Sequence, residues 1–118
     1  MKHDIFFSIS QTPGVDGKTP SEKTMFANYF QQLKHADMLG FGVGWIAQAH
    51  LSTETQKMNS SPVVPHWQGE VGLCTDFPQL AMESFRQTEN IDIGSAVISI
   101  LASGGPIAQA ERIANTVQ

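Results

Sequence analysis

The sequence predicts an α/β fold in which three parallel strands alternate with helices. Short apolar segments suited to buried strands occur at residues 5–9, 44–48 and 91–101. Helical segments, recognised by apolar residues at three- and four-residue spacing, separate the strands and follow the last one. Because crossovers between parallel strands are right-handed, the helices should lie on one side of the sheet, as in the first three βα units of a (β/α)8 TIM barrel.

The first unit joins the strand at residues 5–9 to a helix that begins near Thr19. Thr19 would supply a hydroxyl N-cap, Pro20 the first helical position and Glu22 an acid at the third. Gly40 is expected to end this helix, because glycine adopts the left-handed conformation beyond a helix end at little cost. The side chains expected to face the core are Phe26, Phe30, Leu33 and Ala36.

The second unit begins with the strand at residues 44–48, within a few residues of that helix end. Residues 51–75 are polar and rich in turn formers, which predicts a long loop over the surface. Thr75 or Asp76 can cap the second helix, and Asn90 should end it. Its inward side chains are expected to be Leu80, Ala81, Ser84, Phe85 and Thr88.

The third unit is a mostly apolar strand at residues 91–101 followed by a short glycine-rich turn. Gly94 within the strand indicates a bulge or a close approach of another group to the backbone. Gly104 and Gly105 precede Pro106, which suits the first position of a third helix. The inward side chains of that helix are expected to be Ile107, Ala110, Ile113, Ala114 and Val117.

Length and composition limit the classes of protein. With 41% apolar residues the chain can form a packed core, but 118 residues fall short of the roughly 250 of a complete barrel. Three strands alone would leave two sheet edges unpaired, so we expect either a truncated reading of a longer protein or assembly as a homo- or hetero-oligomer. A net charge of −4 without a Lys/Arg cluster argues against nucleic acid and acidic membranes as partners.

Compartment and metal content follow from a few residue types. Cys74 is the only cysteine and cannot close an intrachain disulfide, which fits a reducing cytoplasm and a plain loop thiol. The start of the chain shows no export signal, and no apolar run reaches the length of a membrane span. His3, His35 and His66 are scattered, so the sequence predicts no metal site.

Three segments resemble one known family. Ala36, Gly40 and Phe41, followed by Trp45 and His50, are similar to the A-x-x-x-G-F … W-x-x-E-H-H signature of bacterial-luciferase-like flavin and deazaflavin oxidoreductases. Residues 88–97 resemble the family's R-T-x-x-I-x-L-G-T-A-V third strand, and residues 105–111 its next, proline-started helix. Together these segments cover almost the whole chain in the family's order.

This resemblance implies that residues 1–118 are the N-terminal portion of a luciferase-like barrel domain. It implies FMN or a deazaflavin as cofactor, reduced by a separate reductase or NAD(P)H, and a small organic substrate. The flavin ring would lie over the barrel mouth, supported by a non-proline cis peptide or a bulge near Ala96 and Val97. In such barrels the carboxyl ends of the strands face the mouth, which adds Ser8, Gln48 and Ser99 as cofactor-binding residues.

The chain departs from the family pattern at two of its polar positions. Where the family has acid-His-His, this chain has Gln48, Ala49 and His50, so the carboxylate and the histidine implied in the acid–base handling of oxygen chemistry are missing. His50 remains the catalytic candidate, because its imidazole can hydrogen-bond flavin or substrate near neutral pH. Alternatively, His50 only packs at a strand end. The chain would then be a non-catalytic partner subunit or an inactive barrel fragment, and an unrelated small α/β binding domain is the third alternative.

Overall fold

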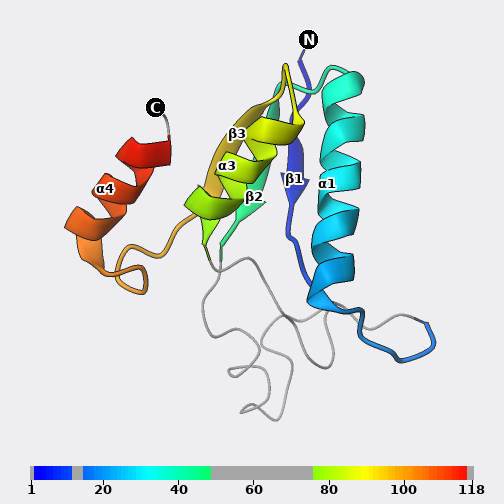
Figure 1. Cartoon of the computed structure of the whole chain (residues 1–118), viewed down its shortest axis with the longest axis horizontal. Coiled ribbons are helices and arrows are strands. Elements are labelled where there is room, and N and C mark those ends of the chain that lie inside the picture. Colours follow the sequence, from blue (N-terminus) through cyan, green and yellow to red (C-terminus); the bar gives the residue numbers. More distant parts are fainter. Residues whose placement is uncertain (1, 12–14, 49–75, 117–118) are drawn as a thin grey trace.

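The computed structural model describes residues 2–11, 15–48 and 76–116. Its elements follow in the order β1 (Ile5–Phe7), α1 (Glu22–Met38), β2 (Val43–Ala47), α3 (Phe77–Gln87), β3 (Asp92–Val97) and α4 (Gly105–Thr116) (Figure 1). The strands form one sheet in the order β1-β2-β3, and both neighbouring pairs are parallel. The predicted α/β class with three parallel strands is confirmed.

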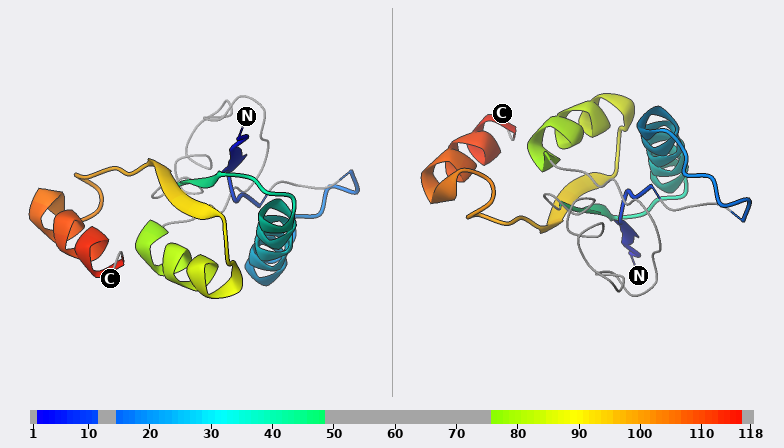
Figure 2. Two further views of the ribbon diagram at one scale, coloured as in Figure 1. Left: turned by 90° about the horizontal axis from the view of Figure 1, so that it is seen from above. Right: turned by 90° about the horizontal axis from the view of Figure 1, so that it is seen from below.

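The sheet has one face covered by helices. Both α1 and α3 lie on the same side of it, as predicted, and α4 lies beside α3 on the side away from α1 (Figure 2). Side chains alternate between the two faces along each strand. Phe7 and Ile46 are buried towards the helices, whereas their neighbours Phe6 and Trp45 point to the opposite face and are exposed.

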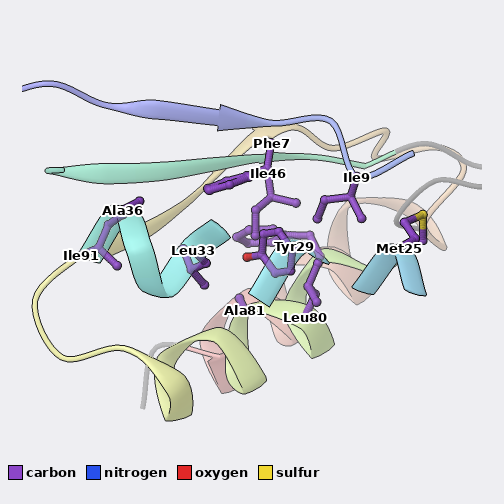
Figure 3. Close-up of a cluster of buried hydrophobic side chains, with 11 residues drawn as sticks. Phe7, Ile9, Met25, Tyr29, Leu33, Ala36, Ile46, Leu80, Ala81 and Ile91 are labelled. Atoms are coloured by element: carbon purple, nitrogen blue, oxygen red, sulfur yellow. The ribbon is translucent and has the colours of Figure 1, made fainter. Parts of the chain in front are cut away.

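The core lies between the sheet and the two covering helices (Figure 3). Tyr29 of α1 stands at its centre, with its ring edge-to-face with Phe7 at a centroid distance of 5.1 Å. The Tyr29 hydroxyl lies 2.8 Å from Ser84 Oγ of α3, so its polar atom has a partner inside the core. The buried apolar residues are Phe7, Ile9, Met25, Tyr29, Leu33, Ala36, Ile46, Phe77, Leu80, Ala81 and Ile91.

The first helix differs from the prediction at its start and on its face. Its N-cap is Ser21 rather than Thr19, and Ser21 Oγ accepts the N–H of Thr24 at 3.2 Å. Leu33 and Ala36 are buried as predicted, but the inward stripe continues through Met25 and Tyr29. The predicted residues Phe26 and Phe30 lie one position further along and pack only partly against the core, because Tyr29 has the buried hydrogen-bond partner. Gly40 has φ +79° and follows the helix end as predicted.

The second helix is close to the prediction. Asp76 is its N-cap, and its carboxylate accepts the N–H of Gln79 at 3.2 Å. Leu80, Ala81 and Ser84 are buried as predicted, whereas the prediction of Phe85 as a core residue is wrong, since its side chain is exposed. The strand before the loop, β2, is shifted by one residue from the predicted 44–48.

The third strand and its helix differ most from the prediction. The strand ends at Val97 rather than at residue 101, because Ser99 begins a turn in which its carbonyl accepts the N–H of Ser103 at 3.0 Å. The described members of the predicted inward stripe of α4 are exposed, with Ile107 at 77% and Ile113 also open to solvent, and Val117 lies outside the described residues. The residue of α4 that is buried is Gln109.

Two carboxylates hold the edge of the sheet where the strands begin, which we call the amino edge. Asp37 at the end of α1 accepts the backbone N–H groups of Glu89, Asn90 and Ile91 at 2.8, 2.9 and 2.8 Å. The Glu89 N–H is the main cause that holds the pKa of Asp37 below its ordinary range, and the N–H groups of Asn90 and Ile91 lower this pKa further. Partial burial acts in the opposite direction but does not outweigh these hydrogen bonds. These bonds fix the connection between α3 and β3.

The second carboxylate of the amino edge is that of Asp4, which precedes β1. It accepts the backbone N–H of Val43 at 3.1 Å and the indole N–H of Trp45 at 3.2 Å. The Trp45 ring lies so close to Gly94 that a Cβ there would stand 2.6 Å from two ring carbons. The predicted close approach at Gly94 is therefore present, and the approaching group is an indole.

Candidate functional site

The carboxyl ends of the three parallel strands meet at one edge of the sheet, which we call the carboxyl edge. Ser8 follows β1, Gln48 follows β2, and Val97 is the last residue of β3. The Gln48 N–H donates to the Val97 carbonyl at 3.2 Å, so the strand pairing continues one residue beyond β2. The structure thus brings Ser8, Gln48 and Val97 to the same edge, as the parallel order requires.

A bulge interrupts β3 at this edge. Ile46 pairs with Ser95 and Ala47 with Val97, so Ala96 is an extra residue with no partner on β2. A bulge breaks the alternation of side chains, and here the consecutive residues Ala96 and Val97 are both exposed, Val97 at 56%. Of the two alternatives implied for this position, the described residues contain the bulge and no cis peptide bond.

The Gln48 side chain connects three parts of the carboxyl edge. It is only 5% exposed, and its Oε1 accepts the backbone N–H of Phe77 at 2.8 Å. Its Nε2 donates to Ser103 Oγ at 3.1 Å. The partners lie 29 and 55 residues further along the chain, so no local sequence pattern could indicate these contacts. Its predicted contact with a cofactor remains a prediction.

The turn that follows β3 projects apolar side chains from the carboxyl edge. Ser99 is exposed, and its Oγ accepts the N–H of Ala102 at 3.4 Å. The Gly105 N–H donates to the carbonyl of Ile100 at 3.0 Å, which closes the turn before α4. Between these bonds Leu101 is 91% exposed, and Ile100 is exposed beside it. Sequence reasoning placed both residues in a buried strand and missed this turn.

A hollow of about 290 Å³ lies at the end of β1 against the first half of α1. Ser8 and Ser10 contribute hydroxyl groups to its lining, and Asn28 and Gln32 contribute amides. Ile9 beneath it has φ +41°, a conformation that is strained for a β-branched residue. Among the described residues the lining carries no charged side chain, and its members are Phe6, Phe7, Ser8, Ile9, Ser10, Pro20, Met25, Asn28, Tyr29 and Gln32. A small uncharged molecule suits this hollow better than a phosphate.

The remaining predicted features have different outcomes. Ala49 and His50, the loop at residues 51–75 and Cys74 lie outside the described residues. Within residues 2–11, 15–48 and 76–116, no three His, Cys, Asp or Glu side chains gather in a way that could hold a metal ion. None of the described helices combines the length and apolar character needed to cross a membrane.

The described residues of the carboxyl edge could contact the ring of a flavin but not the phosphate of FMN. Ala96 and Val97 offer an exposed apolar surface at the bulge, and Ser8 and Ser99 offer hydroxyl groups, which suits a flat uncharged ring with a polar rim. The described lining of the hollow supplies no cationic side chain that could pair with the phosphate of FMN. The described residues of the carboxyl edge could contact an uncharged ring, and a phosphate would need other residues.

Comparison with models of known protein families, with curated proteins and with solved structures finds no match to this chain. We therefore argue its function from the geometry of the carboxyl edge and from the resemblance of the sequence segments.

Proposed function

We propose that this chain forms the first three strand-helix units of a luciferase-like TIM barrel, in a flavin-dependent oxidoreductase or monooxygenase that acts on a small organic substrate. The observation that carries the proposal is the bulge at Ala96, at the end of the third of three parallel strands that follow one another in chain order. The residue resemblance implies a support for the flavin ring at this position. The strand ends share one edge, which the barrel mouth requires.

The roles of the residues follow from what each can do chemically. The flavin or deazaflavin supplies hydride transfer or oxygen activation, and the protein supplies binding and orientation. Ala96 and Val97 would hold the flavin ring through apolar contact, while Ser8 and Ser99 would hydrogen-bond the flavin or the substrate. His50, outside the described residues, would hydrogen-bond the flavin or the substrate through its imidazole. The substrate is uncharged or weakly polar, in keeping with the uncharged lining of the hollow.

Equilibrium dialysis of the full 118-residue chain against FMN and riboflavin tests the proposal. Both ligands should bind weakly and with similar affinity, because the carboxyl edge contacts the ring and not the phosphate. Val97→Asp should weaken binding at least fivefold, since it places a charge on the surface that supports the ring. Ile113→Asp on α4 is the matched control, because Ile113 is also exposed and lies near the end of α4 that is remote from the turn after β3, and it should leave binding unchanged.

Two results would overturn the proposal. One is the absence of flavin binding at millimolar ligand, and the other is equal binding by the wild type and by Val97→Asp. A colourless chain that copurifies with a complete flavin-binding barrel would instead support the non-catalytic partner subunit.

A further inference from the structure

We infer that Gln48 is a positioning residue of the carboxyl edge, which holds the beginning of α3 and the exposed turn after β3 in place through its side-chain amide. The inference deepens the proposed function and rests on it where flavin is concerned. It assigns Gln48 a role through other residues in place of direct cofactor contact.

The first contact of the amide fixes α3. Phe77 is the first residue of this helix, and its N–H has no acceptor within the helix, as is general for the first turn. Gln48 Oε1 accepts that N–H at 2.8 Å in a buried environment. Asp76 accepts the N–H of Gln79 in the same turn. Removal of the Gln48 oxygen would leave a buried donor unpaired, so the start of α3 depends on residue 48.

The second contact fixes the turn after β3. Gln48 Nε2 donates to Ser103 Oγ, and the Ser103 N–H in turn donates to the carbonyl of Ser99. Ser99 also accepts the N–H of Ala102. A continuous path of hydrogen bonds therefore leads from Gln48 through Ser103 to Ser99. The turn between Ser99 and Ser103 carries the exposed apolar side chains of Ile100 and Leu101.

The backbone of Gln48 adds a third contact, because its N–H donates to the carbonyl of Val97 at the bulge. One residue thus touches the end of β3, the turn after it and the start of α3. The surfaces proposed to support the flavin ring, Val97 and Ser99, are each one or two hydrogen bonds away from Gln48. Displacement of the side-chain amide would move Ser99 through Ser103, while the backbone bond to Val97 stays, and it would remove no atom proposed to touch the ligand.

The geometry also predicts which substitution preserves this role. A glutamate at position 48 keeps one oxygen for the Phe77 N–H and a second that can accept the Ser103 hydroxyl. The first turn of α3 favours a negative charge, because its N–H groups and the helix dipole point towards residue 48. A methionine has a similar size but cannot accept the Phe77 N–H well or donate to Ser103. Gln48→Glu is therefore the conservative variant and Gln48→Met the disruptive one.

Amide hydrogen exchange of the full chain, measured residue by residue by NMR without flavin, tests the two contacts. In Gln48→Met, exchange at Phe77 and Ser103 should rise by roughly tenfold, the factor that corresponds to one lost buried hydrogen bond. Exchange at Glu89 and Ile91, which Asp37 holds at the amino edge, should stay unchanged. Gln48→Glu should remain within about twofold of the wild type at all four amides.

Ser103→Ala separates the two contacts and serves if Gln48→Met fails to fold. It should raise exchange within residues 99–103 and leave Phe77 unchanged. In flavin dialysis, Gln48→Met should bind at least fivefold more weakly than the wild type, and Gln48→Glu should restore binding.

The inference is overturned if Gln48→Met leaves Phe77 and Ser103 unchanged, if all amides accelerate equally, or if Gln48→Glu behaves as Gln48→Met. If the wild type binds no flavin, the proposed function fails, and the exchange data alone decide the positioning role.

Discussion

The amino and carboxyl edges of this sheet are held by side chains of different chemistry. At the amino edge the acceptors are carboxylates, with Asp37 taking three backbone N–H groups and Asp4 taking one together with an indole N–H. At the carboxyl edge the connections pass through the neutral amide of Gln48 and the hydroxyl of Ser103. That edge also contains a bulge and the strained Ile9.

The difference predicts that the two edges of the sheet contribute unequally to stability. Charge-assisted hydrogen bonds are about twice as strong as neutral ones, so the amino edge should resist local opening better. The carboxyl edge presents exposed apolar side chains and unusual backbone conformations, features that cluster at binding sites. In α/β barrels, the strand-end side carries chemistry and the opposite side carries stability, and the proposed function assigns the flavin to the corresponding edge of this sheet.

Removal of the Asp37 carboxylate should give the largest loss of stability. Asp37→Ala should lower the free energy of unfolding by about 3 kcal/mol, since three hydrogen bonds to a charged acceptor disappear and water replaces only part of them. Asp37→Asn keeps one acceptor oxygen without the charge and should lose about half as much. Urea unfolding followed by circular dichroism measures both. Equal stability of the wild type and Asp37→Ala would show that the amino edge does not depend on this carboxylate.

Substitution of Gly94 tests its contact with the Trp45 ring, whose indole N–H donates to Asp4. Gly94→Ala should cost about 2 kcal/mol, because its Cβ would overlap the indole and force the ring to move. The same substitution in a Trp45→Ala background should cost much less, since the obstacle is absent, and this double-mutant cycle isolates the contact. Trp45→Ala alone provides the reference. Additive losses in the cycle would mean that the indole does not lie against Gly94.

Acid should weaken the amino edge selectively. The pKa of Asp37 is lowered from 3.8 in the folded chain, mainly by the Glu89 N–H, so folding favours the ionised carboxylate. This contribution to stability is complete above pH 3.8 and disappears as the pH falls through the lowered pKa. The difference in urea midpoint between the wild type and Asp37→Asn should therefore shrink between pH 6 and roughly pH 2.5. A constant difference over this range would contradict the assignment.

Local chemistry made most of the element order predictable from the sequence. Apolar segments, the Asp76 cap and Gly40 each act within a few residues, and the structure has the corresponding strands, helix start and helix end. The resemblance implied a cis peptide or a bulge near Ala96 and Val97, whereas Gly94 by itself indicated a bulge or a close approach within the strand and did not locate the extra residue.

Contacts between distant residues account for what the sequence could not predict. Asp37 reads as a surface residue of a helix, yet its partners lie 52 to 54 residues later. Tyr29 replaces its neighbour Phe30 in the core because Ser84, 55 residues away, accommodates its hydroxyl. At the candidate site, the end of the third strand was predicted four residues too late. Ser99, Ile100 and Leu101 have the composition of a buried strand, and the hydrogen bonds that turn the chain at Ser99 cannot be recognised in the sequence.

A substitution in the apolar stripe of α4 should have the smallest effect on the free energy of unfolding. It tests whether the comparison of the two edges also covers α4. Ile107 follows the periodicity of a core position, but it is exposed, and α4 touches the rest of the chain through α3. Ile107→Gln should change the free energy of unfolding by less than about 0.5 kcal/mol, because an exposed side chain gains little from its surroundings. A loss above about 2 kcal/mol in urea unfolding would show that Ile107 is buried in solution. The carboxyl edge would then continue from the turn after β3 into α4, and stability would not belong to the amino edge alone.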